Sequence, residues 1–235
     1  MVMRKAPRQT GPQRRVTILE AAAERFAAGG YHATTIQEIA TAAGITKPVL
    51  YDHFPSKVQL YITLIEQTRD ELTSSTASAM GRHAPAEARV AAAIEGFFAY
   101  VERRPAAARV LFTPPEGDRE AVEAARRVQA EATARLVALL AAEPDLLPRA
   151  PDRDRRLELC MEFVKIGLHG LAAWWADHPD TPREALVRAS VDLAWGGLRS
   201  QFAAGLTPPA VTPRPGAAES PPAGRPSART SRRGR

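Results

Sequence analysis

Residues 34–60 constrain the fold of this chain more than any other stretch. Thr35 is followed three residues later by Glu38, the spacing of a capping box that satisfies free backbone N–H groups at a helix start. A helix is therefore predicted to begin directly after Thr35. Gly44 is predicted to end it, because glycine adopts a positive φ at little cost. A second short helix is predicted over 46–53.

The apolar residues of this stretch recur at the three- and four-residue spacing of a buried helix face. They are Ile36, Ile39, Ala40, Ala43, Ile45, Val49 and Leu50. Two helices that cross steeply need a small residue at their closest approach and a glycine in the turn, which Ala40 and Gly44 provide. The pattern indicates a helix-turn-helix, whose second helix enters the major groove of DNA.

This stretch resembles the TetR (tetracycline-repressor-like) family of bacterial one-component regulators. The matching residues are Thr34, Thr35, Ile39, Ala40, Ala43, Gly44, Ile45, Leu50, Tyr51, His53, Phe54, Ser56, Lys57 and Leu60. One departure is Pro48, where that family often has glycine or another small residue. Proline disfavours helical geometry at the residue before it, which leaves the start of the second helix open.

Outward-pointing side chains of the predicted helix-turn-helix are the candidate DNA contacts. Thr46, Lys47 and Pro48 are expected to meet base edges. Five more are expected mainly to hold phosphates and set the register on the duplex. They are Thr34, Thr35, Tyr51, His53 and Lys57. Ser56 and Gln59 predict another capping box, which would place Lys57 at a helix N-terminus as a phosphate clamp. The resemblance implies the same role; a solvated lysine is the alternative.

A basic arm over residues 1–11 and a helix from Gln13 are predicted to precede the helix-turn-helix. The apolar stripe of this helix is Val16, Leu19, Ala22, Ala23 and Phe26, and Gly29 and Gly30 are expected to end it. Residues 1–15 and 206–235 each carry a net charge of +5, so the remaining chain carries −4 of the total of +6. Basic ends on an acidic body fit contact with a polyanion.

A helical regulatory and dimerisation domain is predicted over 80–205, separate from the DNA-binding domain over 12–72. Apolar periodicity is lost over 75–84, which indicates the passage between them. Two later helices, over about 155–177 and from 182 onward, each carry two apolar faces and so predict two packing partners. We expect one face of each to form an intersubunit four-helix bundle, which the resemblance also implies. The expected interface residues are Gly167, Gly170, Trp174, Leu193, Gly197 and Leu198.

The resemblance implies a ligand cavity in this second domain, and small-molecule pockets are mostly apolar with aromatic lining. The candidate lining residues are Phe97, Phe98, Tyr100, Phe112, Phe163 and Trp174. Simple core packing is the alternative for each of them.

Motifs for catalysis, metal binding or phosphate cradling are absent from the sequence. No catalytic residue, metal site or cofactor is predicted, and the protein is not expected to be an enzyme. Cys160 and His169 could suggest a nucleophilic pair. However, His169 shares its helical stripe with Glu158, Glu162 and Lys165, which is interpreted as a solvated or rim face.

The tail over 206–235 is rich in proline and arginine and is predicted to be disordered. It could add non-specific DNA affinity or only solubility. One cysteine excludes an intrachain disulfide, and no segment approaches the roughly 20 apolar residues that span a bilayer. A cytoplasmic protein without membrane contact is expected.

Together these features predict an all-α fold of about nine helices, with an N-terminal three-helix DNA-binding domain and a C-terminal helical domain. The predicted function is a homodimeric repressor that leaves a palindromic operator when a small-molecule effector binds. An activator or a partner-controlled regulator of the same fold is the alternative. A helical enzyme or carrier and a non-specific DNA-binding protein acting through its basic ends are further alternatives.

Overall fold

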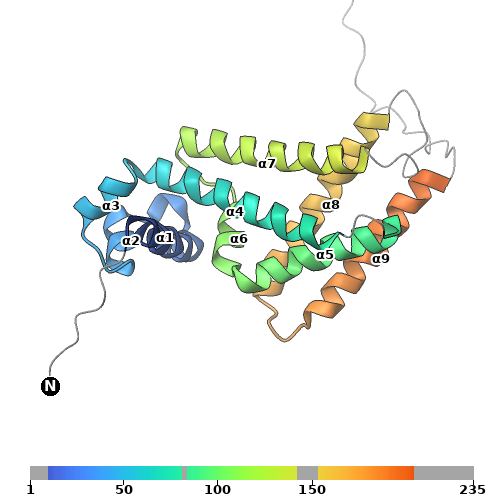
Figure 1. Ribbon diagram of the computed structural model, residues 1–235, viewed down its shortest axis with the longest axis horizontal. Coiled ribbons are helices and arrows are strands. Elements are labelled where there is room, and N and C mark those ends of the chain that lie inside the picture. The colour runs from blue at the N-terminus through green and yellow to red at the C-terminus, as the bar shows by residue number, and fades with distance from the viewer. Residues whose placement is uncertain (1–9, 81–83, 142–152, 204–235) are drawn as a thin grey trace, which may run out of the picture. The chain divides into compact units, whose positions relative to one another are not determined.

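A computed structural model describes residues 10–80, 84–141 and 153–203 of the chain. The regular elements in chain order (Figure 1) are α1 (Gly11–Ala33), α2 (Ile36–Ala42), α3 (Lys47–His53), α4 (Lys57–Ala79), α5 (Ala86–Arg103), α6 (Pro105–Phe112), α7 (Arg119–Ala141), α8 (Arg153–Ala176) and α9 (Arg183–Ala203). These nine helices, with no strand among the described residues, confirm the predicted all-α fold. Residues 1–9 of the predicted arm and the tail over 206–235 lie outside the described residues.

The first helix begins earlier than predicted because Thr10 caps it. Thr10 and Gln13 form a capping box, with the Thr10 N–H donating to Gln13 Oε1 at 3.0 Å. The helix breaks at Gly30, where φ is 76°, close to the predicted stop. Val16 is 47% exposed and Ile18 is fully buried, so the buried stripe begins later than predicted.

The predicted helix-turn-helix is formed by α2 and α3. The Glu38 N–H donates to Thr35 Oγ1 at 3.2 Å, and the Thr35 N–H donates to the Glu38 carboxylate at 2.7 Å. Gly44 has a φ of 67° in the turn. Because α3 starts at Lys47, Pro48 occupies its first turn, where no intrahelical N–H bond is lost.

The fourth helix continues through residues 75–79, so the loss of apolar periodicity there does not coincide with the end of the helix. The small residues that interrupt the apolar pattern lie where the α5 backbone approaches closely. A Cβ on Gly96 would come within 2.9 Å of the Ser75 carbonyl oxygen, and Ser75 Oγ donates to the Gly96 carbonyl oxygen at 3.2 Å. At the start of α4, Ser56 accepts from the Gln59 N–H at 3.1 Å. The Gln59 amide group donates to Glu120 at 3.4 Å, so only half of the expected box is formed.

Two clusters of buried side chains hold the helices together. The first includes Ile18, Phe26, Ile39, Leu50, Phe54 and Tyr61 from α1–α4, and it continues into α6 and α7 through Val110, Leu111 and Val128. The second joins α5, α8 and α9 through Ile94, Phe98, Ala172 and Leu186. The core of the helix-turn-helix is therefore continuous with that of the second half, and the domain boundaries at residues 72 and 80 stay a prediction.

Helix α6 occupies the position between the helix-turn-helix and the later helices. It contacts α1, α4, α5 and α8, while α4 packs against both α5 and α7 (Figure 1). A displacement of α6 would therefore change the packing of helices in both halves of the chain.

Candidate DNA-binding surface and ligand cavity

The beginning of α3 presents its side chains to solvent. Thr46, Lys47 and Pro48 are exposed, and the Thr46 hydroxyl makes no capping bond to the described backbone. Tyr51, one turn later, is 42% exposed, and its ring centroid lies 5.8 Å from the Lys47 ammonium. Leu50 is fully buried. One face of α3 is thus packed into the core, and the other is open to a duplex.

Arg15 on α1 holds the C-terminal end of α3, a role that sequence reasoning missed. Its guanidinium lies 4.2 Å from the centroid of the Phe54 ring, and its NH1 donates to the His53 carbonyl oxygen at 3.1 Å. A positive charge at a helix C-terminus is favourable. The two segments are 38 residues apart, so no local spacing could have indicated the contact.

Two predicted phosphate contacts, Thr34 and Lys57, lie at the joint between α1 and α2. Lys57 Nζ donates to the carbonyl oxygens of Tyr31 at 3.0 Å, His32 at 3.2 Å and Thr34 at 3.1 Å, which uses its three protons. The Thr34 side chain is buried, and its hydroxyl donates to two α1 carbonyl oxygens at 2.8 and 3.1 Å. Both side chains therefore stabilise the joint, and a phosphate contact by either would replace these bonds.

The remaining predicted phosphate contacts lie at helix ends. Thr35 is exposed at the start of α2, where its hydroxyl donates to Glu38 at 2.8 Å. His53 is half-buried at the end of α3. The structure thus brings Thr46, Lys47, Pro48 and Tyr51 together on one exposed surface of a single helix.

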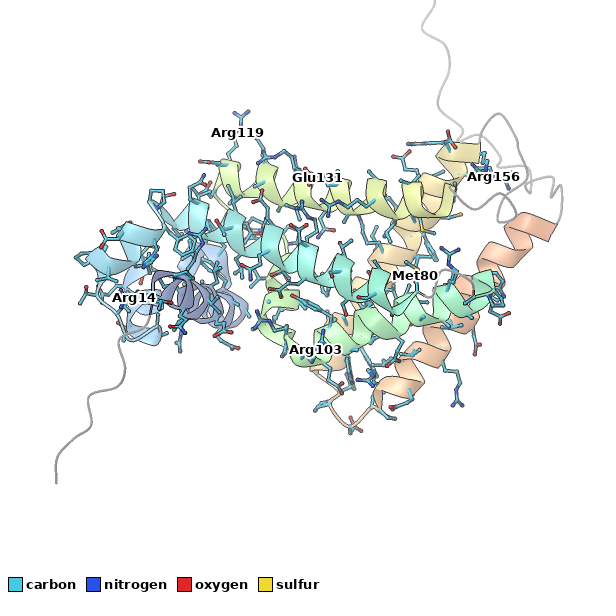
Figure 2. The ribbon with its side chains drawn as sticks, in the orientation of Figure 1. Arg14, Met80, Arg103, Arg119, Glu131 and Arg156 are labelled. Atoms are coloured by element: carbon cyan, nitrogen blue, oxygen red, sulfur yellow. The ribbon has the colours of Figure 1, made fainter. Side chains whose placement is uncertain are left out.

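A cavity of about 390 Å³ lies among α4, α5, α7 and α8. Its apolar wall includes Leu72, Met80, Ile94, Phe97, Val128 and Met161. Met80 directly follows α4 (Figure 2). Leu111 of α6 also lines the cavity, so a helix that packs on α1 forms part of the cavity wall.

A polar cluster forms one part of the cavity wall. Lys165 is only 9% exposed, and its ammonium donates to Thr133 Oγ1 at 2.6 Å, Glu162 Oε1 at 2.9 Å and the Gln129 carbonyl oxygen at 3.3 Å. The interpretation of the α8 stripe as a solvated or rim face is therefore wrong at Lys165, whereas Glu158 is exposed and Glu162 and His169 are half-buried. Packing of α7 against α8 buries Lys165.

Arg69 on α4 contributes a second buried charge to the wall. Its guanidinium pairs with Asp70 at 3.0 Å and with Glu131 on the facing α7 (Figure 2). Arg135 also lines the cavity and pairs with Asp70 at 3.0 Å. The Arg69 and Arg135 guanidinium groups lower the pKa of Asp70 despite its partial burial.

The six aromatic residues predicted to line a ligand pocket are dispersed. Phe97 lines the internal cavity. Phe98 and Tyr100 are buried in the core beside it, and the Tyr100 hydroxyl donates to Glu71 at 3.2 Å. Phe112 lies against His169, with ring centroids 3.9 Å apart. Phe163 and Trp174 are 81% and 44% exposed on α8, outside the cavity.

An open, mainly apolar groove of about 780 Å³ runs between α8 and α9. Five of the six predicted interface residues line it: Gly167, Gly170, Trp174, Leu193 and Gly197. The side chain of the sixth, Leu198, lies outside the described residues. Arg156, near the start of α8 (Figure 2), and the exposed Phe163 also line the groove. A Cβ on Gly167, Gly170 or Gly197 would meet nothing within 4 Å, so these glycines leave space at the surface.

Direct hydrogen bonds connect α1, which packs against α2, with the later helices. The Tyr31 hydroxyl donates to Asp118 Oδ2 at 2.8 Å, and Asp118 also accepts from the Ala121 N–H in the first turn of α7. The Tyr31 hydrogen bond, followed by that N–H, lowers the pKa of Asp118. Arg104 NH1 donates to Glu20 of α1 at 3.1 Å. Movement of α7 or of the α5–α6 turn can therefore reach α1.

The fold and this surface define a helix-turn-helix DNA-binding protein. Residues 18–64 match the family described as bacterial regulatory proteins, tetR family. Over 197 residues the chain is 32% identical to the HTH-type transcriptional activator FasR of Mycolicibacterium smegmatis, covering 83% of this chain and 87% of FasR. The chain belongs to the TetR family and is a DNA-binding transcriptional regulator.

Solved structures share this fold. A TetR-like transcriptional regulator from Rhodococcus sp. RHA1 has a TM-score of 0.67 and 22% identity, covering 82% of this chain and 99% of that one. FadR from Bacillus subtilis, solved in complex with stearoyl-CoA, has a TM-score of 0.66 and 18% identity, covering 77% of this chain and 98% of FadR.

Residues 10–80, 84–141 and 153–203 were also considered for metal-ligand groups and for membrane-spanning helices. They contain no group of three or more His, Cys, Asp or Glu side chains that could hold a metal ion. In the same part of the chain, no helix is long and apolar enough to cross a membrane. The relatives named above are all described as regulators.

Proposed function

We propose that this protein is a homodimeric repressor that binds a palindromic operator and leaves it when an effector with a long acyl chain enters the internal cavity. The observation that carries this proposal is the apolar cavity among α4, α5, α7 and α8, which is also lined by Leu111 of α6. The stearoyl-CoA held by FadR, which has the same fold, supports an acyl chain as the ligand class.

On DNA, the start of α3 would enter the major groove. Thr46 and Lys47 would read base edges, and Pro48 would contact a thymine methyl group. Tyr51, Thr35 and His53 would hold phosphates. Thr34 and Lys57 would stabilise the α1–α2 joint and not bind phosphates, because their donor groups already hydrogen-bond to carbonyl oxygens there.

Dimerisation is supported by the groove between α8 and α9. Phe163 and Leu193 are 81% and 79% exposed beside glycines that leave room for another helix. Covering such apolar surface with the same helices of a second copy is favourable and would build a four-helix bundle. Two recognition helices would then meet two half-sites, which requires a palindromic operator.

The dimer is tested by the molecular mass of Leu193→Glu in light scattering. A charge in the groove should convert the dimer to a monomer, whereas Val16→Glu, at an exposed apolar position on α1, should leave a dimer. A monomeric wild-type protein at micromolar concentration would contradict the proposal.

Release from DNA would follow from a different affinity of the effector for two conformers. A ligand that displaces Leu111 would move α6 against α1, and a shift of α7 would act through Asp118 and Tyr31. Both routes would change the spacing of the recognition helices in the dimer.

The effector is tested by fluorescence anisotropy of a labelled operator duplex with the full chain. Stearoyl-CoA should release the duplex at micromolar concentration, and coenzyme A alone should not. Retention of the duplex at saturating stearoyl-CoA, together with no direct binding of this ligand, would exclude the acyl effector.

An activator is the second candidate, and it is favoured by the name of FasR, a relative aligned over most of its length. The two are separated by measuring transcripts from operator-bearing promoters after deletion of the gene. A repressor predicts higher transcript levels, and an activator predicts lower ones.

A further inference from the structure

His169 is a polar side chain in the wall of the otherwise largely apolar cavity. Its ring is nearly parallel to that of Phe112, with centroids 3.9 Å apart and an interplanar angle of 18°. It is also nearly parallel to the Phe97 ring, at 6.0 Å and 12°. These contacts fix the plane of the imidazole. Neither ring nitrogen has a hydrogen-bond partner among the residues that the structure describes.

The imidazole is neutral at physiological pH. Burial, followed by the nearby Lys165 ammonium, lowers the pKa of His169 to about 4, and Glu162 opposes this only in part. A neutral imidazole offers one N–H donor and one acceptor nitrogen. His169 is half-buried, and its nitrogens are not among the fully buried polar atoms, so a ligand in the cavity can supply an acceptor for this donor.

The charged groups around the cavity already have partners of opposite charge. Lys165 pairs with Glu162 at 2.9 Å, and Arg69 and Arg135 each pair with Asp70 at 3.0 Å. A free carboxylate placed here would lose its hydration and would have to compete with these acids for a cation. An uncharged acceptor, such as a carbonyl oxygen, requires only a neutral donor.

We propose that His169 anchors the effector by donating a hydrogen bond to the carbonyl oxygen of an acyl thioester, and so selects the thioester over the free fatty acid. This inference rests on the proposed acyl effector and adds the group that recognises it. The hydrocarbon chain would lie along the apolar wall, and Phe97 and Phe112 would hold the imidazole in place.

The test compares two ligands that differ only at the carbonyl: stearoyl-CoA and the octadecyl thioether of coenzyme A, in which a methylene group replaces it. Isothermal titration calorimetry gives the affinity of the full-length wild-type protein and of His169→Phe for each. Phenylalanine keeps an aromatic ring against Phe112 and near Phe97, and it removes both nitrogens.

His169→Phe should bind stearoyl-CoA about ten-fold more weakly than wild type, because one hydrogen bond to a neutral group is lost. Its affinity for the thioether should change less than about two-fold, because that ligand has no carbonyl group. His169→Gln, which keeps an N–H donor, should recover most of the affinity for stearoyl-CoA. Stearate should bind wild type more weakly than stearoyl-CoA does.

Equal losses for both ligands would assign His169 to packing alone and overturn the anchor. Unchanged affinity for stearoyl-CoA would also overturn it while leaving the acyl effector intact. If wild type bound neither ligand, both the effector class and the anchor would be wrong.

Discussion

Replacement of Lys57 by methionine separates a structural lysine from a phosphate clamp. The change keeps a long side chain and removes the ammonium that holds the carbonyl oxygens of Tyr31, His32 and Thr34. It also removes the contact of that ammonium with the Tyr31 ring, whose centroid is 4.4 Å away. The joint between α1 and α2 would then lose these three hydrogen bonds to the start of α4.

The size of the effect follows from the burial of these bonds. Two of the three are half-buried and one is exposed. A hydrogen bond from a charged donor contributes about 1.5 to 3 kcal/mol when desolvated, and water can partly replace the ammonium here. We expect Lys57→Met to lower the free energy of unfolding by about 2 to 3 kcal/mol, which lowers Tm by about 5 to 10 °C in a chain of this size.

Urea denaturation followed by circular dichroism measures this loss. Lys47→Met is the matched control: Lys47 is exposed, and its replacement should change stability by less than about 0.5 kcal/mol. The salt dependence of operator binding gives an independent readout, since each phosphate contact contributes about 0.9 to its slope. A Lys57→Met protein of unchanged stability whose salt slope falls by about one would refute the structural role.

Three further predictions concern other contacts. Tyr31→Phe should lower the free energy of unfolding by about 1 kcal/mol at pH 7, and this deficit should shrink below about pH 4, because the lowered pKa of Asp118 stabilises the fold only while Asp118 is ionised. Between pH 6.5 and 4 the wild-type protein should lose up to about 3 kcal/mol of stability through His169, and His169→Phe should be spared this loss. In wild type only the unfolded chain takes up this proton, since the pKa of His169 is lowered to about 4; denaturation at several pH values measures both effects. Lys47→Ala should weaken operator binding and relax sequence preference, whereas Tyr51→Phe should weaken binding to all duplexes alike. Competition binding measures both effects, and an unchanged sequence preference in Lys47→Ala would exclude base reading by Lys47.

Local signals made the helix-turn-helix predictable. The Thr35–Glu38 capping box and the positive φ of Gly44 depend on neighbours within a few residues, and both are present in the structure. The surface exposed by α3 followed from the burial of Leu50. The apolar faces of α8 and α9 could likewise be predicted from the three- and four-residue spacing of their apolar residues.

Contacts between distant segments could not be predicted in this way. Lys57 meets carbonyl groups 23 to 26 residues away, and the polar cavity wall joins Thr133 to Lys165, 32 residues apart. Whether a helix stripe faces solvent or a neighbouring helix depends on packing, so the helical period alone does not predict that Lys165 is buried. Gly96 and Ser75 lie where α4 and α5 approach closely, and such small residues weaken the apolar pattern in the sequence.

Sequence-specific binding by a dimer can be tested by selecting bound sequences from random duplex DNA with the purified full chain at near-physiological salt. A sequence-specific dimer should select a two-fold symmetric motif whose half-sites are centred about one helical turn, or a multiple of it, apart. Enrichment without any motif, with affinity falling steeply with salt, would contradict it and would indicate a non-specific DNA-binding protein.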